Sequence, residues 1–221
     1  MEQKENRVVL RGTVAGEAVL SHQVHGIDFY RFPLAVPRLS GREDLLNILF
    51  PLSSPETALP QAGAFVEVTG EIRSFNNRSG VGNRLVITVL ARSVVPGEGD
   101  PCNQVFLHGV LCKPPVLRRT PLGRDICDLL LAVNRRYRRA DYLPCIAWGS
   151  LAHLCGGLTV GDRVRLTGRL QSRLYNKTIE GRLEERTAFE VSIMSLTQEE
   201  VSPPPEPILL HTQAIQTEGG L

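Results

Sequence analysis

The sequence of 221 residues is poor in aromatic side chains and contains no long apolar run. Aromatic residues make up 5% of it, and there is a single tryptophan. No segment approaches the roughly 20 apolar residues of a membrane span, and the polar N-terminus lacks the apolar stretch of a secretory signal. We therefore expect a cytoplasmic protein that has neither a membrane nor a small-molecule substrate as a partner.

Motifs for metal binding or catalysis are also lacking. The five cysteines all lie between residues 102 and 155, and no two are spaced as CxxC. Because zinc sites usually need close ligand pairs, we expect free thiols, no metal and no cofactor. The five histidines are scattered, and neither a phosphate-binding loop nor a GxSxG motif occurs. We do not expect an enzyme.

Charge is distributed unevenly along the chain. Residues 103–197 contain 15 Lys and Arg against 8 Asp and Glu, whereas residues 6–95 contain 9 against 7. A basic excess concentrated in one segment indicates an anionic partner for that segment.

The chain contains an internal repeat. Four pairs of segments match in the same order, at offsets of 97, 97, 98 and 102 residues: 6–14 with 103–111, 28–38 with 125–135, 62–74 with 160–172, and 84–94 with 186–196. Two copies of about 90 residues indicate two similar domains.

The repeat and the turn-rich segments predict the domain organisation. We expect one domain over residues 1–95, a linker over 96–102, a second domain over 103–198, and a flexible tail over 199–221. Each copy consists mainly of short alternating segments typical of strands, and only Ser150–Cys155 is typical of a short helix. The predicted fold is all-β: two tandem OB-fold five-stranded barrels, each with at most one short helix. The pattern alone leaves another small β-barrel open.

Six segments of the second copy carry a specific resemblance: NQVFLHGVL (103–111), LRRTPLG (117–123), LLLAVNRRY (129–137), IAWGSLAHLC (146–155), GDRVRLTGRLQSRLY (161–175) and RTAFEV (186–191). In this order they resemble the bacterial single-stranded DNA-binding protein family, and the first copy is similar to a diverged relative. The resemblance implies sequence-tolerant binding of single-stranded DNA in replication, recombination or repair. It also implies a nucleoid-associated homodimer with four OB domains.

Binding single strands without sequence preference requires a basic groove and aromatic platforms. The resemblance places base-stacking rings at Tyr137, Tyr142, Trp148 and Tyr175. The basic and polar candidates of the second copy are Arg118, Arg119, Asn134, Arg135, Arg136, Arg138, Arg139, Arg173 and Lys177. The first copy offers two arginines, Arg38 and Arg73, and two aromatic rings, Phe50 and Phe75. Phe50 lines up with Trp148.

Each of these candidates has a plainer reading. The run of arginines can be a solvated loop, and Trp148 can be a core residue that shares a face with Ile146. Tyr142 departs from the family's pattern because Leu143-Pro144 follows it. Tyr175 lies beside a polar segment, Asn176-Lys177, that reads as a turn.

The first copy lacks the central part of this surface. At the positions of Asn134, Arg136 and Tyr137, the first copy has Pro37, Leu39 and Ser40. It is therefore expected to bind weakly or to serve mainly in dimerisation.

An alternative function is an OB-fold protein-interaction accessory factor of the replication or restart machinery, with weak DNA binding. The chain ends in Gly219-Gly220-Leu221 and lacks the acidic, phenylalanine-ended tip of the family. Replication and repair proteins thus remain possible partners, without the usual feature that recruits them.

Overall fold

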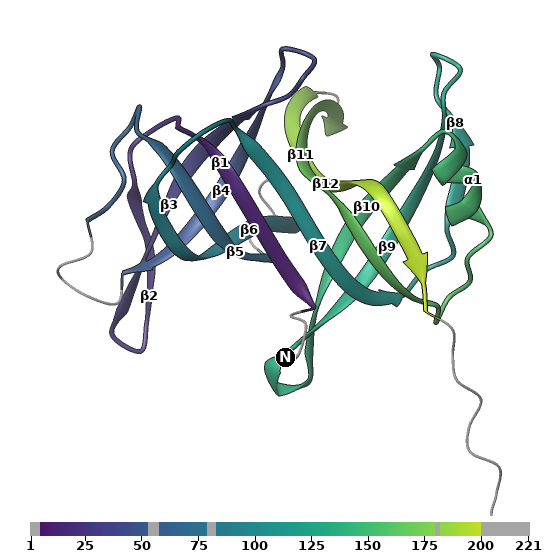
Figure 1. Cartoon of the computed structure of the whole chain (residues 1–221), viewed down its shortest axis with the longest axis horizontal. Helices are drawn as coiled ribbons and strands as arrows, with labels where there is room; N and C mark the ends of the chain where they lie inside the picture. The colour runs from purple at the N-terminus through teal and green to yellow at the C-terminus, as the bar shows by residue number, and fades with distance from the viewer. Residues whose placement is uncertain (1–4, 53–57, 79–82, 180–181, 200–221) are drawn as a thin grey trace, which may run out of the picture.

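The computed structural model describes residues 5–52, 58–78, 83–179 and 182–199. Within these ranges the strands form one continuous sheet that closes into two barrels lying side by side (Figure 1). The first barrel consists of β1 (Asn6–Val14), β2 (Val19–Val24), β3 (Ile27–Pro37), β4 (Glu43–Leu52), β5 (Phe65–Asn76) and β6 (Leu85–Pro96). The second consists of β7 (Cys102–Leu111), β8 (Val116–Arg119), β9 (Asp125–Arg135), β10 (Arg139–Trp148), β11 (Arg163–Ile179) and β12 (Arg182–Gln198).

The two barrels have the same topology, which confirms the predicted tandem OB fold. In the first, β1 pairs antiparallel with both β3 and β5, and β4 pairs parallel with β6. In the second, β7 pairs in the same way with β9 and β11, and β10 pairs parallel with β12. A short helix, α1 (Ser150–Gly156), follows β10 as predicted.

Alternating side chains build the two cores. In β1, for example, Val8, Leu10 and Val14 are buried, whereas Arg7 and Thr13 are exposed. Fully burying one such aliphatic side chain contributes roughly 1.5–3 kcal/mol. The strands of both barrels follow this pattern, so the positions that repeat in the sequence are largely core positions.

One repeated glycine has a steric reason. A Cβ atom at Gly12 would collide with the carbonyl oxygen of Ala35, and one at Gly109 would lie 2.6 Å from the carbonyl oxygen of Ala132. These contacts occur where the first strand of each barrel meets the third strand to close it. Close backbone approach of this kind requires glycine.

The barrels are joined by antiparallel pairing of β1 with β7. Val8 pairs with Val105, its own counterpart in the repeat, and Asn6 and Leu10 pair with Leu107 and Asn103. Each strand thus offers the other the same positions, as in a two-fold symmetric interface. The repeat predicted two domains but not this shared sheet.

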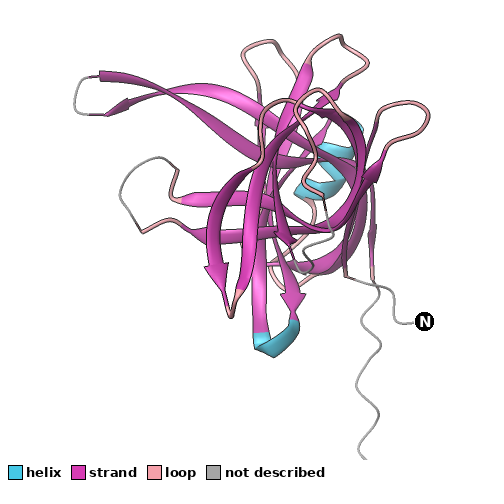
Figure 2. Ribbon diagram, turned by 90° about the vertical axis from the view of Figure 1, so that its left-hand side faces the viewer, coloured by secondary structure: helices cyan, strands magenta, loops and turns pink. Residues whose placement is uncertain are grey.

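The barrels differ most in one hairpin. Strands β11 and β12 remain paired out to Ile179 and Arg182, whereas β5 and β6 are paired only to Asn76 and Leu85. The longer hairpin projects from the molecule (Figure 2). The turn expected at Asn176-Lys177 is therefore wrong, because both residues lie within β11 and pair with β12. No helix in the part of the chain described here is long and apolar enough to cross a membrane.

Candidate nucleic-acid interface

The tip of the β9–β10 hairpin carries the most exposed aromatic ring among the described residues. Arg135 and Arg139 pair across the hairpin, and the three residues Arg136–Arg138 between them form its turn. The Tyr137 side chain is 91% exposed. A ring held in solvent at the end of two paired strands is available to stack on a base.

The backbone of this tip is strained. Tyr137 and Arg138 have φ angles of 61° and 54°, in the left-handed region that side chains other than glycine disfavour. This conformation costs roughly 1–2 kcal/mol per residue. Such strain is typical of functional sites, where the surrounding structure maintains it.

Arginines surround the ring, but they are not equivalent. Arg136, Arg138 and Arg139 are exposed, and no residue in the described ranges forms an ion pair or hydrogen bond with their guanidinium groups. Arg135 is half-buried and its Nη1 lies 3.4 Å from Asp141 Oδ1. Three arginines at the tip are thus free to meet phosphates. Asn134, beside them on β9, is also exposed.

Two further rings lie along β10. Tyr142 and Trp148 are 49% and 40% exposed. They are six residues apart and share one side of the strand, which separates them by roughly 20 Å. Ile146, which was expected to share the face of Trp148, is buried, but the exposure of Trp148 shows that Trp148 is not a core residue.

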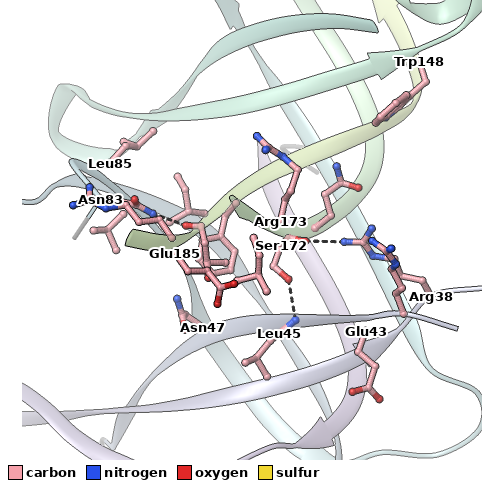
Figure 3. A pocket seen from close by; sticks show the side chains of 18 residues that line it. Arg38, Glu43, Leu45, Asn47, Asn83, Leu85, Trp148, Ser172, Arg173 and Glu185 are labelled. Carbon is pink, nitrogen blue, oxygen red and sulfur yellow. Dashed lines mark hydrogen bonds between the residues drawn. The ribbon is translucent and has the colours of Figure 1, made fainter. Parts of the chain in front are cut away.

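Trp148 lines a groove of about 910 Å³ between the barrels. In Figure 3, Trp148 and Arg173 approach the groove from the second barrel, and Arg38 and Leu45 approach it from the first. Four arginines and two glutamates contribute to its lining: Arg38, Arg42, Arg173, Arg186, Glu43 and Glu185. The sequence analysis missed Arg42 and Arg186, since nothing in their local sequence indicates a shared groove.

Tyr175 occupies a different environment from the other rings. It is half-buried, and its hydroxyl donates a hydrogen bond to Asn83 Oδ1 of the first barrel at 3.1 Å. The guanidinium carbon of Arg173 lies 5.7 Å from the centre of the Tyr175 ring. This ring therefore contributes to contact between the barrels. Lys177 lies in β11, but its side chain is outside the described part of the structure.

Arg118 and Arg119 lie on β8 and pair with acids on β9. Arg118 pairs with Asp128, and Arg119 Nε lies 2.7 Å from Asp125 Oδ1. His153 Nε2 lies 3.0 Å from the other oxygen of Asp125. The hydrogen bonds from Arg119 and then from His153 lower the pKa of Asp125 to about 2. These exposed ion pairs partly satisfy both arginines before any ligand arrives.

Phe50 is not a binding platform, because its side chain is 6% exposed and belongs to the core of the first barrel. Pro51 lies opposite Phe29 in the β3–β4 pair, as Trp148 lies opposite Ile126 in the β9–β10 pair. Pro51 is thus the counterpart of Trp148. The predicted alignment was displaced by one residue, which moves a side chain to the other face of a strand.

The other candidates of the first copy divide into two kinds. Arg38 and Arg73 are partly buried and form ion pairs with the buried carboxylates of Asp44 and Asp141. Arg73 thereby contacts the second barrel, and Arg38 does so by donating from Nη2 to the carbonyl oxygen of Ser172 at 2.9 Å. The prediction of a DNA-binding role for these arginines did not foresee this. Phe75 is half-exposed at the counterpart position of Arg173, since both follow the last repeated serine.

The fold and this surface define the class of the molecule, a tandem OB-fold protein whose second barrel carries exposed rings and arginines. Residues 102–198 match the model of the Single-strand binding protein family. The chain is 39% identical over 80 residues to single-stranded DNA-binding protein A of Bacillus subtilis, covering 33% of this chain and 46% of the relative. It is 33% identical over 100 residues to the single-stranded DNA-binding protein of Halalkalibacterium halodurans, covering 42% and 56%. The chain thus spans about half the length of the curated relatives it matches.

Solved structures extend the likeness to both barrels. The wild-type single-stranded DNA-binding protein of Thermus aquaticus superposes with a TM-score of 0.70 at 27% identity, over 90% of this chain and 95% of that chain. A deletion mutant of the same protein superposes with a TM-score of 0.72 at 27% identity, over 94% and 100%. The second barrel is thus similar to the Single-strand binding protein family, and the likeness to the Thermus aquaticus protein extends over both OB-fold barrels.

Proposed function

We propose that this protein binds single-stranded DNA without sequence preference and protects it during replication, recombination or repair. The observation that carries the proposal is the β9–β10 tip, where Tyr137 stands 91% exposed among three arginines that have no partner in the described ranges. The names of the relatives and structural neighbours support the same ligand.

The proposed chemistry uses the two parts of an unpaired strand. Base faces stack on Tyr137, Tyr142 and Trp148, at about 1–3 kcal/mol for each base. Phosphates meet Arg136, Arg138 and Arg139 and displace their counterions, so binding weakens as salt rises. Neither contact reads base identity. Asn134, Arg118, Arg119, Arg173, Tyr175, Lys177 and Phe75 remain predicted contacts of this surface.

A fluorescence titration of the full chain with dT oligomers tests the proposal. Trp148 is the single tryptophan and it lines the groove, so its emission is expected to be quenched as DNA binds. Duplex of the same length is expected to bind much more weakly, because its bases are already stacked. A flat titration at low salt would remove the proposed function.

We also propose a homodimer, in which two chains bring together four OB domains, taken as residues 1–95 and 103–198 of each chain. Support comes from the outer face of the joined sheet, where the apolar side chains of Val95 and Phe106 are 45% and 39% exposed. Light scattering is expected to give twice the mass of one chain. A monomer at micromolar concentration would contradict this part of the proposal.

The alternative, an accessory factor that binds replication or repair proteins more than DNA, is less favoured. The family match lies in the barrel that carries the rings and the unpaired arginines. The same titration separates the two functions, because an accessory factor would bind dT oligomers weakly even at low salt.

A further inference from the structure

Two buried carboxylates lie between the barrels at equivalent positions of the repeat. Asp44 on β4 and Asp141 on β10 are 1% and 0% exposed. Asp44 Oδ1 accepts a hydrogen bond from the backbone N–H of Ser172 in the other barrel, at 2.8 Å. Asp141 Oδ1 accepts one from the backbone N–H of Ser74, at 2.7 Å.

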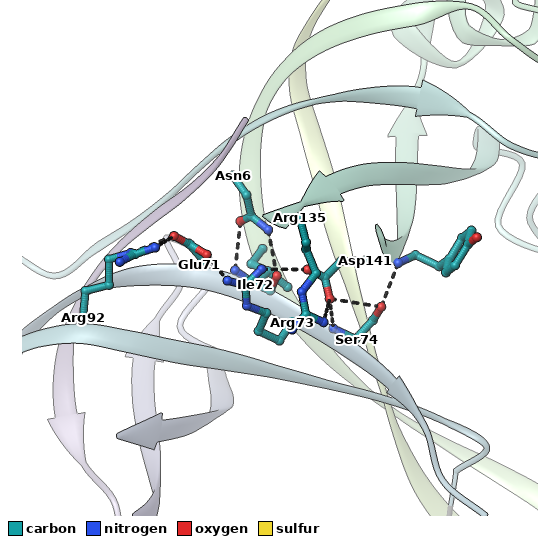
Figure 4. A network of polar contacts seen from close by, with 9 residues as sticks. Asn6, Glu71, Ile72, Arg73, Ser74, Arg92, Arg135 and Asp141 are labelled. Carbon is teal, nitrogen blue, oxygen red and sulfur yellow. Dashed lines mark hydrogen bonds and ion pairs between the residues drawn. The ribbon is translucent and has the colours of Figure 1, made fainter. Parts of the chain in front are cut away.

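The same two serines return a second bond. The backbone N–H of Leu45 donates to Ser172 Oγ at 3.0 Å, and that of Tyr142 donates to Ser74 Oγ at 2.7 Å. The first of these bonds is visible in Figure 3 and the second contact lies in the network of Figure 4. A serine of each barrel therefore binds the hairpin of the other barrel, β3–β4 or β9–β10, at its aspartate. We call the two contacts, Asp44 with Ser172 and Asp141 with Ser74, the clamps.

The two clamps differ in their cations. Asp141 is paired with Arg73 of the first barrel at 2.9 Å and with Arg135 of its own barrel at 3.4 Å. Arg73 also pairs with Glu71, which in turn pairs with Arg92, so a chain of charges backs the contact (Figure 4). At the other clamp, Asp44 pairs with Arg38 of its own barrel, and Arg38 Nη2 also donates to the carbonyl oxygen of Ser172 in the second barrel at 2.9 Å.

The difference arises at one position of the repeat. The counterpart of Arg73 on β11 is Gln171, whose amide bonds Glu190 within its own barrel at 2.8 Å. The first barrel thus sends a charged side chain across to Asp141, and the second barrel sends none to Asp44 from the equivalent position.

The clamp at Asp141, which has an arginine from each barrel, lies next to the Tyr137 tip. Asp141 is the third residue of β10, and Arg135 is the last residue of β9. The contact therefore holds both strands of the hairpin within a few residues of Tyr137. Buried polar networks rigidify the elements they join, and in this one Arg73 Nε is buried without a hydrogen-bond partner among the described residues.

We propose that the first barrel positions the single-stranded-DNA-binding hairpin of the second. Arg73 and Ser74 act through Asp141 as positioning residues and need not touch the DNA. This inference rests on the proposed function. It assigns the first barrel a part in binding that does not depend on rings of its own.

The test compares the two clamps in the full chain, using dT oligomers at low salt. Asp141→Asn removes a charge beneath the Tyr137 tip, and Asp44→Asn removes one beneath the tip of the first barrel. We expect Asp141→Asn to weaken binding by about fivefold or more, at least about three times the effect of Asp44→Asn. Equal losses in the two variants would overturn the inference.

Arg73→Gln is the milder variant, because it installs the side chain of the counterpart Gln171. We expect it to weaken binding by about two- to fivefold and to lower the melting temperature, because the buried Asp141 and Glu71 lose a cation. If Asp141→Asn does not fold, this variant decides the matter. An affinity within about 1.5-fold of the wild type would then overturn the inference.

A double-mutant cycle separates positioning from general stability. In a chain that already carries Arg136→Ala and Tyr137→Ala, Arg73→Gln is expected to change the remaining affinity by less than about 1.5-fold, because its effect acts through the hairpin. Independent, multiplicative losses would contradict positioning. A wild-type chain that does not bind dT would remove the proposed function itself, whereas binding without coupling would remove only this inference.

Discussion

The two hairpin tips of the repeat share a backbone plan but differ in every side chain. In the first barrel the three tip residues are Leu39, Ser40 and Gly41, and the backbone N–H of Arg38 closes the turn on the carbonyl oxygen of Arg42 at 2.7 Å. In the second barrel they are Arg136–Arg138. Glycine has a φ angle of 78° at the last tip position of the first barrel, and Arg138 has one of 54° at the same position of the second.

With the proposed function, this difference indicates how a binding surface is added to a stable scaffold. Glycine adopts a positive φ angle at little cost, whereas arginine does so with strain. The second barrel keeps the strained residue, and it thereby gains a third free cation beside Tyr137. The first barrel has the relaxed turn and only the uncharged Leu39 and Ser40. At the position of Gly41 and Arg138, the proposed binding and stability thus favour different residues. The first barrel has the stable glycine, and the second has the cationic arginine.

The largest expected effect comes from removing the tip. Arg136→Ala combined with Tyr137→Ala is expected to lower the affinity for dT oligomers by about 30-fold or more, because a stacked ring contributes about 1–3 kcal/mol and a phosphate contact is lost as well. Fluorescence titration measures it. The matched control is Leu39→Ala at the exposed counterpart position, where we expect less than about a twofold change. An affinity of the double variant within about twofold of the wild type would show that the site is misassigned.

The reverse exchange tests the same comparison from the other side. Leu39→Arg with Ser40→Tyr places an arginine and a ring on the first tip, where Gly41 preserves the turn. We expect a gain of a few-fold in affinity, below the loss at the second tip, because the first tip has Gly41 where the second has Arg138.

A smaller effect is expected at Arg138, where one substitution should change both the stability of the protein and the salt dependence of its affinity for DNA. Arg138→Gly relieves the positive φ angle and is expected to raise the free energy of unfolding by about 1 kcal/mol. It also removes one phosphate contact, so the slope of log affinity against log salt should fall by about 0.7. Thermal unfolding and salt titrations measure the two changes. A variant that melts at a lower temperature than the wild type would contradict the interpretation of strain.

The smallest effect is expected on β8. Arg119 is already paired with Asp125, so Arg119→Ala should change affinity by less than about twofold. The variant should also raise the pKa of Asp125 from about 2 toward the ordinary 3.8, although His153 still donates to it. NMR titration of the carboxyl group measures this change. A loss of affinity comparable to that of the tip variant would place β8 at the centre of the surface.

The same pKa fixes the direction of the acid response. A carboxyl whose pKa is lowered by folding stabilises the folded state at neutral pH, and this contribution disappears as the pH falls from about 4 to about 2. In Arg119→Ala the contribution is smaller from the start. The free energy of unfolding of this variant should therefore fall less steeply than that of the wild type as the pH is lowered from about 4 to about 2.

Much of the binding surface could be predicted from local sequence, because it depends on residue type and position in a repeat. Four arginines around a tyrosine, after a strand and before another, indicate an exposed basic tip wherever the strands lie. The positions of Tyr142 and Trp148 followed from the resemblance of their neighbours. Phe50 shows the limit of this reasoning. The two copies were aligned one residue out of register there, and in a strand such a shift exchanges a core side chain for a surface one.

The roles of Arg38, Arg73 and Arg135 could not be read in this way. An arginine near a predicted binding loop suits a phosphate and a buried carboxylate equally well, and the partner is far away in the sequence. Asp141 is 68 residues from Arg73. A signal was nevertheless present, because Asp44 and Asp141 recur at the offset of 97 that relates the two copies.

By itself the sequence determined the repeat, the β-strand content of its two copies and the composition of the second tip, because alternation and turn chemistry act between near neighbours. Only the tertiary structure decided that β1 and β7 share one sheet and that Phe50 is buried. It also decided that each hairpin is held to the opposite barrel by one aspartate. These features depend on which surfaces meet after both barrels have closed. Complementarity between distant surfaces leaves no periodic pattern along the chain, so it appears only once the strands are in place.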